Sequence, residues 1–220
     1  MNVSDSREAA FVARVTASTT HEMRNVLAIV KESAGLIEDM VHAYAKRGAL
    51  NEERLLRAVG RIDAQVARGA EIVAHLNRFA HSLDHTRERI DLDGVVRQVA
   101  FLGERFARQG THKIEVRPGN AGLAVEASAL LLQMALFAGI ECCLNGLSEP
   151  ATAVLRVGLT DGSPSIEFAS EVGGRVAAGA AGAASGWGQL VELVGELGAS
   201  LVADDAKRRF RLTFPGAVNA

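Results

Sequence analysis

Apolar side chains recur every three or four positions over the first 85 residues, and this spacing constrains the fold more than any other feature of the sequence. The first run of the pattern contains no proline and extends from residue 8 to about residue 46, after which Gly48 interrupts it. Asn51 is placed to cap a second helix, and Glu52 and Glu53 suit its first turn. The pattern predicts two long helices that pack as an antiparallel hairpin.

The second of these helices repeats an apolar or small residue at heptad positions along its length. These positions are Leu55, Val59, Ile62, Val66, Gly69, Ala70, Val73, Leu76, Ala80 and Leu83. Each helix of a hairpin covers only part of its partner, so a full heptad stripe needs a further helical surface for burial. A second copy of the chain supplies that surface in a four-helix bundle across a two-fold axis. The sequence therefore predicts a homodimer that forms through residues 8–85.

Beyond residue 85 the apolar pattern breaks into shorter segments of strand and helix character. The predicted helices cover residues 93–108, 127–144 and 187–197. The predicted strands cover residues 89–92, 113–117, 123–125, 154–159, 165–168, 200–203 and 208–214. Asp161 and Gly162 suit the turn of a hairpin between two of these strands. The expected fold class is α+β: an N-terminal helical hairpin over 1–87, then a C-terminal α/β sandwich over 88–220 with a mixed sheet and helices on one face.

Charge and composition exclude several classes of function. The chain carries 24 basic and 26 acidic side chains, a balance that argues against nucleic-acid binding through many phosphates and against a polybasic membrane surface. No apolar run approaches the ~20 residues of a membrane span, and the N-terminal residues lack the basic and apolar regions of a signal peptide. The adjacent Cys142 and Cys143 suit neither a disulfide nor a four-ligand metal site. We therefore expect a cytoplasmic protein with no resident metal and no nucleic-acid or membrane partner.

The segment from His21 to Asn25 carries the most distinctive chemistry of the first helix, and three interpretations compete. A zinc-protease helix needs a second histidine four residues after the first, but Asn25 takes that position. A polar surface helix is the simplest alternative. The third interpretation is a phosphoacceptor, because His21 lies two residues before Met23, on the flank of the apolar stripe, where an imidazole faces solvent. Glu22 can orient one ring nitrogen and leave the other as a nucleophile, with Asn25 one turn further on the same face.

Residues 18–29 resemble the H-box of the dimerisation and histidine-phosphotransfer domain of two-component sensor histidine kinases. The resemblance covers about residues 8–215 and includes the order of the elements in the second domain. Residues 125–144, 186–198 and 208–215 fall where the ATP-binding domain of such kinases has its N-box helix, its G2-box helix and its last strand. The resemblance implies a dimeric helical bundle followed by a kinase-like ATP-binding fold.

The positions that would hold ATP in an active kinase depart from the family pattern. Phe137 and Glu141 stand at the positions of the N-box asparagines, and of the two only the carboxylate is a ligand type for Mg²⁺. The turn expected to supply an aspartate for adenine contains Ser170 and no aspartate, a loss worth about 1–3 kcal/mol. Gly186 and Gly188 keep part of a phosphate-binding turn. These changes imply a degenerate ATPase-like domain with no nucleotide cofactor.

Residues 173–186 fall at the position of the ATP lid and hold five glycines and six alanines in 14 positions. Arg175 is the only cation among them, so the segment offers little to a phosphate. Because so few side chains are available for packing, we expect a mobile loop. Trp187, the only tryptophan, follows this segment and either packs against the core or fills the vacated nucleotide pocket.

The chain is most similar to histidine phosphotransferases that derive from kinases, and this resemblance implies a role for each site residue. His21 would accept a phosphoryl group from the aspartyl phosphate of one response-regulator receiver domain and pass it to another. Glu22 would orient the imidazole, Arg24 and Asn25 would contact the phosphoryl group or the partner, and Mg²⁺ would arrive with the receiver. No cofactor is expected to bind tightly. Two alternatives stay open: a divergent ATP-dependent sensor kinase, and a non-catalytic dimer that binds a regulator.

Overall fold

A computed structural model describes residues 3–47, 51–82, 87–204 and 206–216. The chain divides into two compact units, Met1–Phe79 and Ala80–Ala220. They contain the expected hairpin and the expected sandwich, with the division after residue 79 where the sequence suggested residue 87. Gly48 and Leu83, which the apolar pattern placed at the ends of helices, lie outside the described residues.

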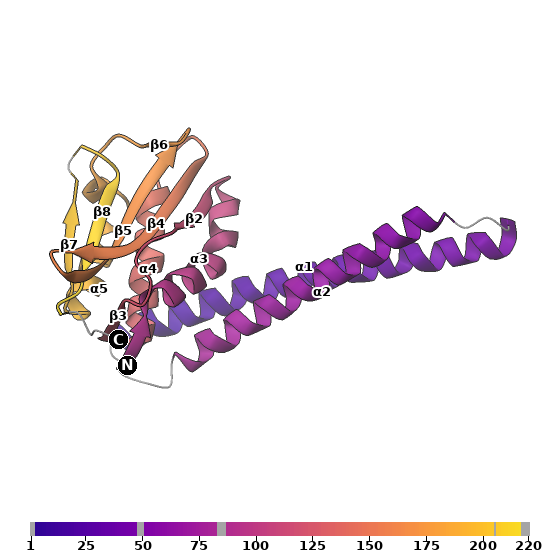
Figure 1. Cartoon of the computed structure of the whole chain (residues 1–220), viewed down its shortest axis with the longest axis horizontal. Coiled ribbons are helices and arrows are strands. Elements are labelled where there is room, and N and C mark those ends of the chain that lie inside the picture. Colours follow the sequence, from indigo (N-terminus) through magenta and orange to yellow (C-terminus); the bar gives the residue numbers. More distant parts are fainter. Residues whose placement is uncertain (1–2, 48–50, 83–86, 205, 217–220) are drawn as a thin grey trace. The chain divides into compact units, whose positions relative to one another are not determined.

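The first unit is an antiparallel pair of long helices, α1 (Val3–Arg47) and α2 (Glu52–His81), as Figure 1 shows. The two helices confirm the prediction made from the heptad pattern. Asn51 caps α2 as expected, because its Oδ1 accepts a hydrogen bond from the backbone N–H of Arg54 over 2.9 Å. Two glutamates in the first turn of α2 add negative charge at the positive end of the helix dipole.

The buried seam between the two helices uses only part of the apolar pattern. On α2, Ala58, Ile72 and Phe79 are buried, and the ring of Phe79 meets Phe11 of α1 edge-on with 5.8 Å between centroids. Other heptad residues form an exposed stripe that consists of Leu27 and Val41 on α1 and Val59, Val66 and Val73 on α2. The hairpin thus leaves apolar surface uncovered, as expected for two helices that cannot bury a full heptad repeat alone.

The second unit is an α/β sandwich built on a mixed sheet. The strands of the sheet are β2 (Lys113–Arg117), β4 (Ala151–Thr160), β5 (Ser163–Val172), β6 (Arg175–Val176), β7 (Ser200–Ala203) and β8 (Arg209–Thr213). Their order is β2–β4–β5–β8–β7, and β6 pairs with β5. β2 runs parallel to β4, and the other neighbours are antiparallel. A separate antiparallel pair joins β1 (Glu88–Asp91) to β3 (Ala124–Ala127).

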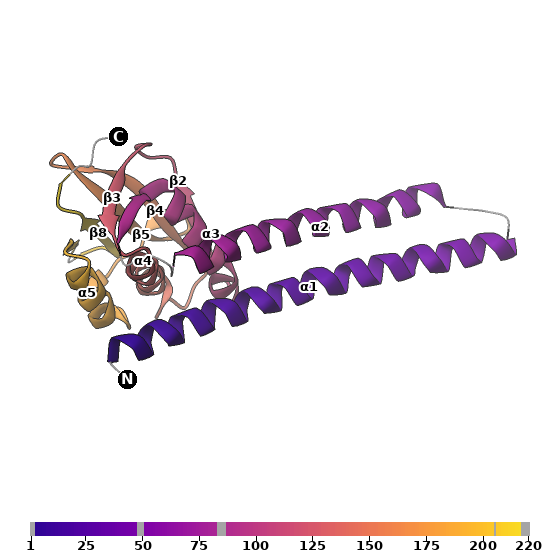
Figure 2. The same ribbon diagram turned by 90° about the horizontal axis from the view of Figure 1, so that it is seen from below.

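Helices cover one face of this sheet (Figure 2). They are α3 (Leu92–Gln109), α4 (Ala129–Leu144) and α5 (Trp187–Glu196). α4 is the central, buried helix that the sequence predicted. Gly139 of α4 lies directly against Phe168 of β5, and Phe168 stacks on Phe210 of β8 with 4.9 Å between ring centroids. The α+β fold class, with its mixed sheet and one helical layer, is therefore confirmed.

The lid segment, residues 173–186, was expected to be a mobile loop, and it contains the short strand β6 and a 3₁₀ turn at Ala181–Ala183, although most of its residues are exposed. Gly173 and Gly174 turn the chain at positive φ angles of 58° and 79°, and β6 then pairs with β5. The backbone N–H of Ala177 donates to the carbonyl of Ser170 over 2.7 Å. Backbone hydrogen bonds hold the segment where side chains are few, and composition alone does not reveal such bonds.

Candidate functional site

His21 lies on α1, one helical turn before Asn25. Both side chains are exposed, as is that of Arg24. Within the part of the chain that the structure describes, no hydrogen bond or ion pair holds the His21 imidazole. Thr19 and Val26, which flank the segment, are buried. The imidazole is therefore open to solvent, as expected for a residue on the flank of the apolar pattern.

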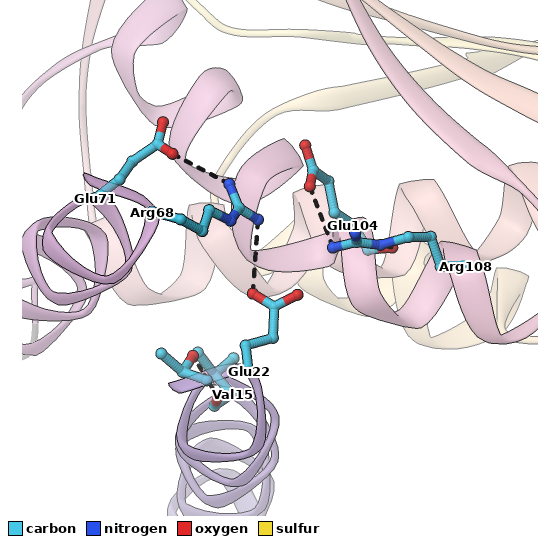
Figure 3. Close-up of polar contacts among 7 residues, drawn as sticks. Val15, Glu22, Arg68, Glu71, Glu104 and Arg108 are labelled. Atoms are coloured by element: carbon cyan, nitrogen blue, oxygen red, sulfur yellow. Dashed lines mark hydrogen bonds and ion pairs between the residues drawn. The ribbon is translucent and has the colours of Figure 1, made fainter. Parts of the chain in front are cut away.

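Glu22 projects toward α2, where it meets Arg68 (Figure 3). Its Oε2 lies 3.7 Å from Nη2 of Arg68, and Nη1 of Arg68 donates to Oε2 of Glu71 over 3.1 Å. The side chains of Glu22 and Arg68 are only 16% and 28% exposed. Sequence reasoning missed Arg68, because the pair depends on the register between two helices and no local spacing signals it.

The two helices approach each other closely in this part of the hairpin. A Cβ built on Gly69 of α2 would lie 3.4 Å from Val26 Cγ1 and 3.7 Å from Met23 Sδ on α1, so the segment of α1 next to His21 packs closely on α2.

Further along α2, Arg78 Nη2 lies 3.2 Å from His75 Nδ1. Burial lowers the pKa of His75, and the positive charge of Arg78 lowers that pKa further. His75 is therefore less readily protonated than an exposed histidine.

Two of the expected nucleotide positions, Phe137 and Ser170, are buried in the second unit. Phe137 is 4% exposed, and its ring meets Phe106 of α3 edge-on with 5.9 Å between centroids. Ser170 was expected in a turn but lies within β5, which is longer than the predicted strand because its pairing with β4 continues to residue 172. The Ser170 hydroxyl donates to the carbonyl of Cys143 over 2.7 Å. Glu141 is partly exposed.

The remaining two nucleotide positions, Gly186 and Gly188, lie at the start of α5. Gly186 is the N-cap in a left-handed conformation with φ of 89° and no side-chain cap, and Gly188 is exposed. Between them, Trp187 packs edge-on against Phe210 with 5.2 Å between centroids. A Cβ built on Gly182 would lie 3.5 Å from the indole Nε1 of Trp187. Of the two roles considered for Trp187, packing against the core is the one observed, and the same indole supports the lid segment.

The thiols of Cys142 and Cys143 should resist alkylation in the folded protein. Burial raises the pKa of Cys142 to about 11 and that of Cys143 to about 12, and Cys142 Sγ also lies 3.9 Å from the carbonyl of Ser185 in the lid segment. Since the thiolate is the reactive form, we expect no reaction with iodoacetamide at about pH 8 in the native protein and complete reaction in urea. Mass spectrometry measures the extent of alkylation in the native protein and in the protein unfolded in urea. Rapid labelling of Cys142 in the native protein would contradict the burial of this thiol.

No three histidine, cysteine, aspartate or glutamate side chains gather into a possible metal site among residues 3–47, 51–82, 87–204 and 206–216. In the same residues, no helix combines the length and the apolar character that a membrane crossing requires. A cavity of about 300 Å³ opens beside β5, β7 and β8. Its charged lining residues are Glu167, Asp204, Arg209 and Arg211, and the sequence had singled out none of these.

No protein-family model and no curated protein matches this sequence. Among solved structures, the catalytic domain of the histidine kinase ThkA is 13% identical, with 60% of this chain and 96% of that chain covered and a TM-score of 0.46. The Acinetobacter baumannii histidine kinase AdeS is 14% identical, with 88% and 96% covered and a TM-score of 0.44. ThkA in complex with the response regulator TrrA is 13% identical, with 95% and 63% covered and a TM-score of 0.45. The chain is thus similar to histidine kinase structures, and at such low identities its function has to be inferred from its own side chains.

Proposed function

We propose that this chain is a histidine phosphotransferase of two-component signalling, in which His21 takes a phosphoryl group from the aspartyl phosphate of one receiver domain and passes it to another without using ATP. One contrast carries the proposal: the His21 imidazole is open to solvent, whereas Phe137 and Ser170 at the nucleotide positions are buried. A protein that offers a nucleophilic imidazole, and that lacks the asparagines and the aspartate that hold ATP in the kinase pattern, needs an external phosphoryl donor.

Transfer at His21 is a displacement at phosphorus. The lone pair of the unprotonated ring nitrogen forms a P–N bond while the P–O bond to the aspartate of the receiver breaks, and the aspartate leaves as a carboxylate. The receiver supplies the Mg²⁺ that offsets the charge of the phosphoryl oxygens. The second transfer is the same displacement in reverse on another receiver. Neither step needs ATP, because the donor already carries an activated phosphoryl group.

Three neighbours of His21 support this chemistry. Glu22, the residue next to His21, is proposed to orient the imidazole, as the resemblance to the H-box implies, while Arg68 engages its Oε2. Arg24 and Asn25 are exposed on the same stretch of α1, where a guanidinium and an amide can donate hydrogen bonds to phosphoryl oxygens or contact the rim of the receiver. A long helix holds these groups in fixed relative positions, which reduces the entropic cost of reaching the reactive geometry.

A homodimer is proposed on the basis of the exposed stripe of the hairpin. Leu27 is 59% exposed and Val66 is 58% exposed in the single chain. A second copy that packs its own stripe against this one would complete a four-helix bundle. The α/β sandwich is proposed to serve as a docking surface for the receiver and to have no catalytic part.

The test is phosphoryl transfer from a receiver domain that carries a radiolabelled aspartyl phosphate. We expect acid-labile label on the wild-type chain and none on His21→Ala. His42→Ala is the matched control, because His42 is an exposed histidine of the same helix with a carboxylate neighbour, Glu38 Oε1, at 3.8 Å from its Nε2. Its loss should leave transfer unchanged.

Two outcomes would favour the alternatives. Label on His21 from ATP and Mg²⁺ alone, with no receiver present, would identify a divergent sensor kinase, for which the partly exposed carboxylate of Glu141 is the candidate metal ligand. Full signalling in cells by His21→Ala would identify a non-catalytic dimer that binds a regulator.

A further inference from the structure

Arg68 of α2 reaches across the hairpin to Glu22, the residue that follows His21 (Figure 3). Its guanidinium bridges two carboxylates, with Nη2 3.7 Å from Glu22 Oε2 and Nη1 3.1 Å from Glu71 Oε2. Because the guanidinium group of an arginine is planar and rigid, the directions of its two contacts, with Glu22 and with Glu71, are fixed relative to each other. The position of the Glu22 carboxylate on α1 is therefore tied to α2.

A second ion pair crosses the hairpin and provides a comparison. Arg61 Nη2 lies 4.0 Å from Glu32 Oε2, and these side chains are 53% and 72% exposed. Arg68 and Glu22 are 28% and 16% exposed. Solvent screens the first pair on both sides, whereas the pair beside His21 is shielded and keeps more of its electrostatic strength.

We propose that Arg68 is a positioning residue for phosphoryl transfer at His21: it anchors the Glu22 carboxylate and neutralises its charge. This role rests on the proposed phosphotransferase function. An incoming phosphoryl group is an anion, and the negative charge of the Glu22 carboxylate on the adjacent residue repels it. With Arg68 in place, the carboxylate is held at one oxygen and its charge is offset by the guanidinium. Glu71, the other carboxylate on Arg68, is 52% exposed, so solvent screens its charge more effectively.

The test compares transfer kinetics at several receiver concentrations in the wild type, Arg68→Ala and Arg68→Met, of which the last keeps the aliphatic stem. We expect kcat to fall about tenfold in both variants while KM changes less than about threefold, as when an interaction of the transition state is lost. Arg68→Lys keeps the positive charge without the planar fork and should recover part of the loss. Arg61→Ala, which removes the exposed pair across the hairpin, should transfer like the wild type.

A double variant separates positioning from structural support. In a Glu22→Gln background no carboxylate is left to anchor or neutralise, so the addition of Arg68→Ala should leave kcat unchanged from that background. The proposal is overturned if Arg68→Ala lowers kcat equally in that background, or if Arg68→Ala and Arg68→Met both transfer at the wild-type rate. A wild-type chain that takes no label from the receiver would instead refute the phosphotransferase function itself.

Discussion

Val66→Glu combined with Val73→Glu should convert the protein from a dimer to a monomer. Both side chains belong to the exposed stripe of α2 and are 58% and 55% exposed in the single chain. In a bundle about a two-fold axis the stripe meets its own copy, so each substitution places carboxylates against apolar neighbours in both chains. Complete burial of an exposed valine contributes about 1.5 kcal/mol, and these side chains, which are a little over half exposed, can gain about 0.9 kcal/mol each. Since the change removes two valines from each chain, the dissociation constant should rise by at least about 10².

Sedimentation velocity over a range of protein concentrations measures this change. Val202→Glu is the control, because Val202 is 66% exposed but lies on β7, in the other unit. That variant should sediment like the wild type. A double variant that remains a dimer would show that the stripe is not the interface, and a monomeric wild type would remove the homodimer from the proposed function.

The hairpin could be predicted from sequence because its signals are local. Heptad spacing and the Asn51 cap depend on residues a few positions apart. The choice of buried face could not be predicted in the same way, since Ile72 is 1% exposed and Val73 beside it is 55% exposed. Both are apolar and β-branched, and only the packing of α1 against α2 distinguishes them. The Glu22–Arg68 pair was missed for the same reason.

In the second unit, the interactions that the sequence did not reveal are long-range backbone contacts. The strand at 165–168 was recognised, but its extension through Ser170 depends on pairing with β4. The lid segment was expected to lack packing because its side chains are small, whereas the backbone of Ala177 bonds to Ser170 and that of Gly179 bonds to Ala206. Small residues allow the backbone such close approach, so the same composition is compatible with a mobile loop and with a packed segment.

Gly139→Val should destabilise the α/β sandwich by about 3 kcal/mol, through overpacking of the core. A Cβ on Gly139 would lie 2.7 Å from Phe168 Cε1, and the fully buried Phe168 ring is backed by Phe210. Urea unfolding followed by the fluorescence of Trp187 measures the effect in this unit alone, since it is the only tryptophan and packs on Phe210. Gly195→Ala in α5 is the control, because no atom lies within 4 Å of a Cβ there, and it should be neutral or stabilising.

An unchanged unfolding free energy in Gly139→Val would mean that α4 moves away from the sheet to make room. The packing on the other side of α4 opposes that movement, because Phe137 meets Phe106 edge-on and Phe137 Cε1 would lie 3.7 Å from a Cβ on Gly103. α4 is therefore held between α3 and β5 by aromatic rings on both sides. Phe137 stands at the position of an N-box asparagine in the kinase pattern. Its packing against α3 is part of what makes the expected effect of Gly139→Val large.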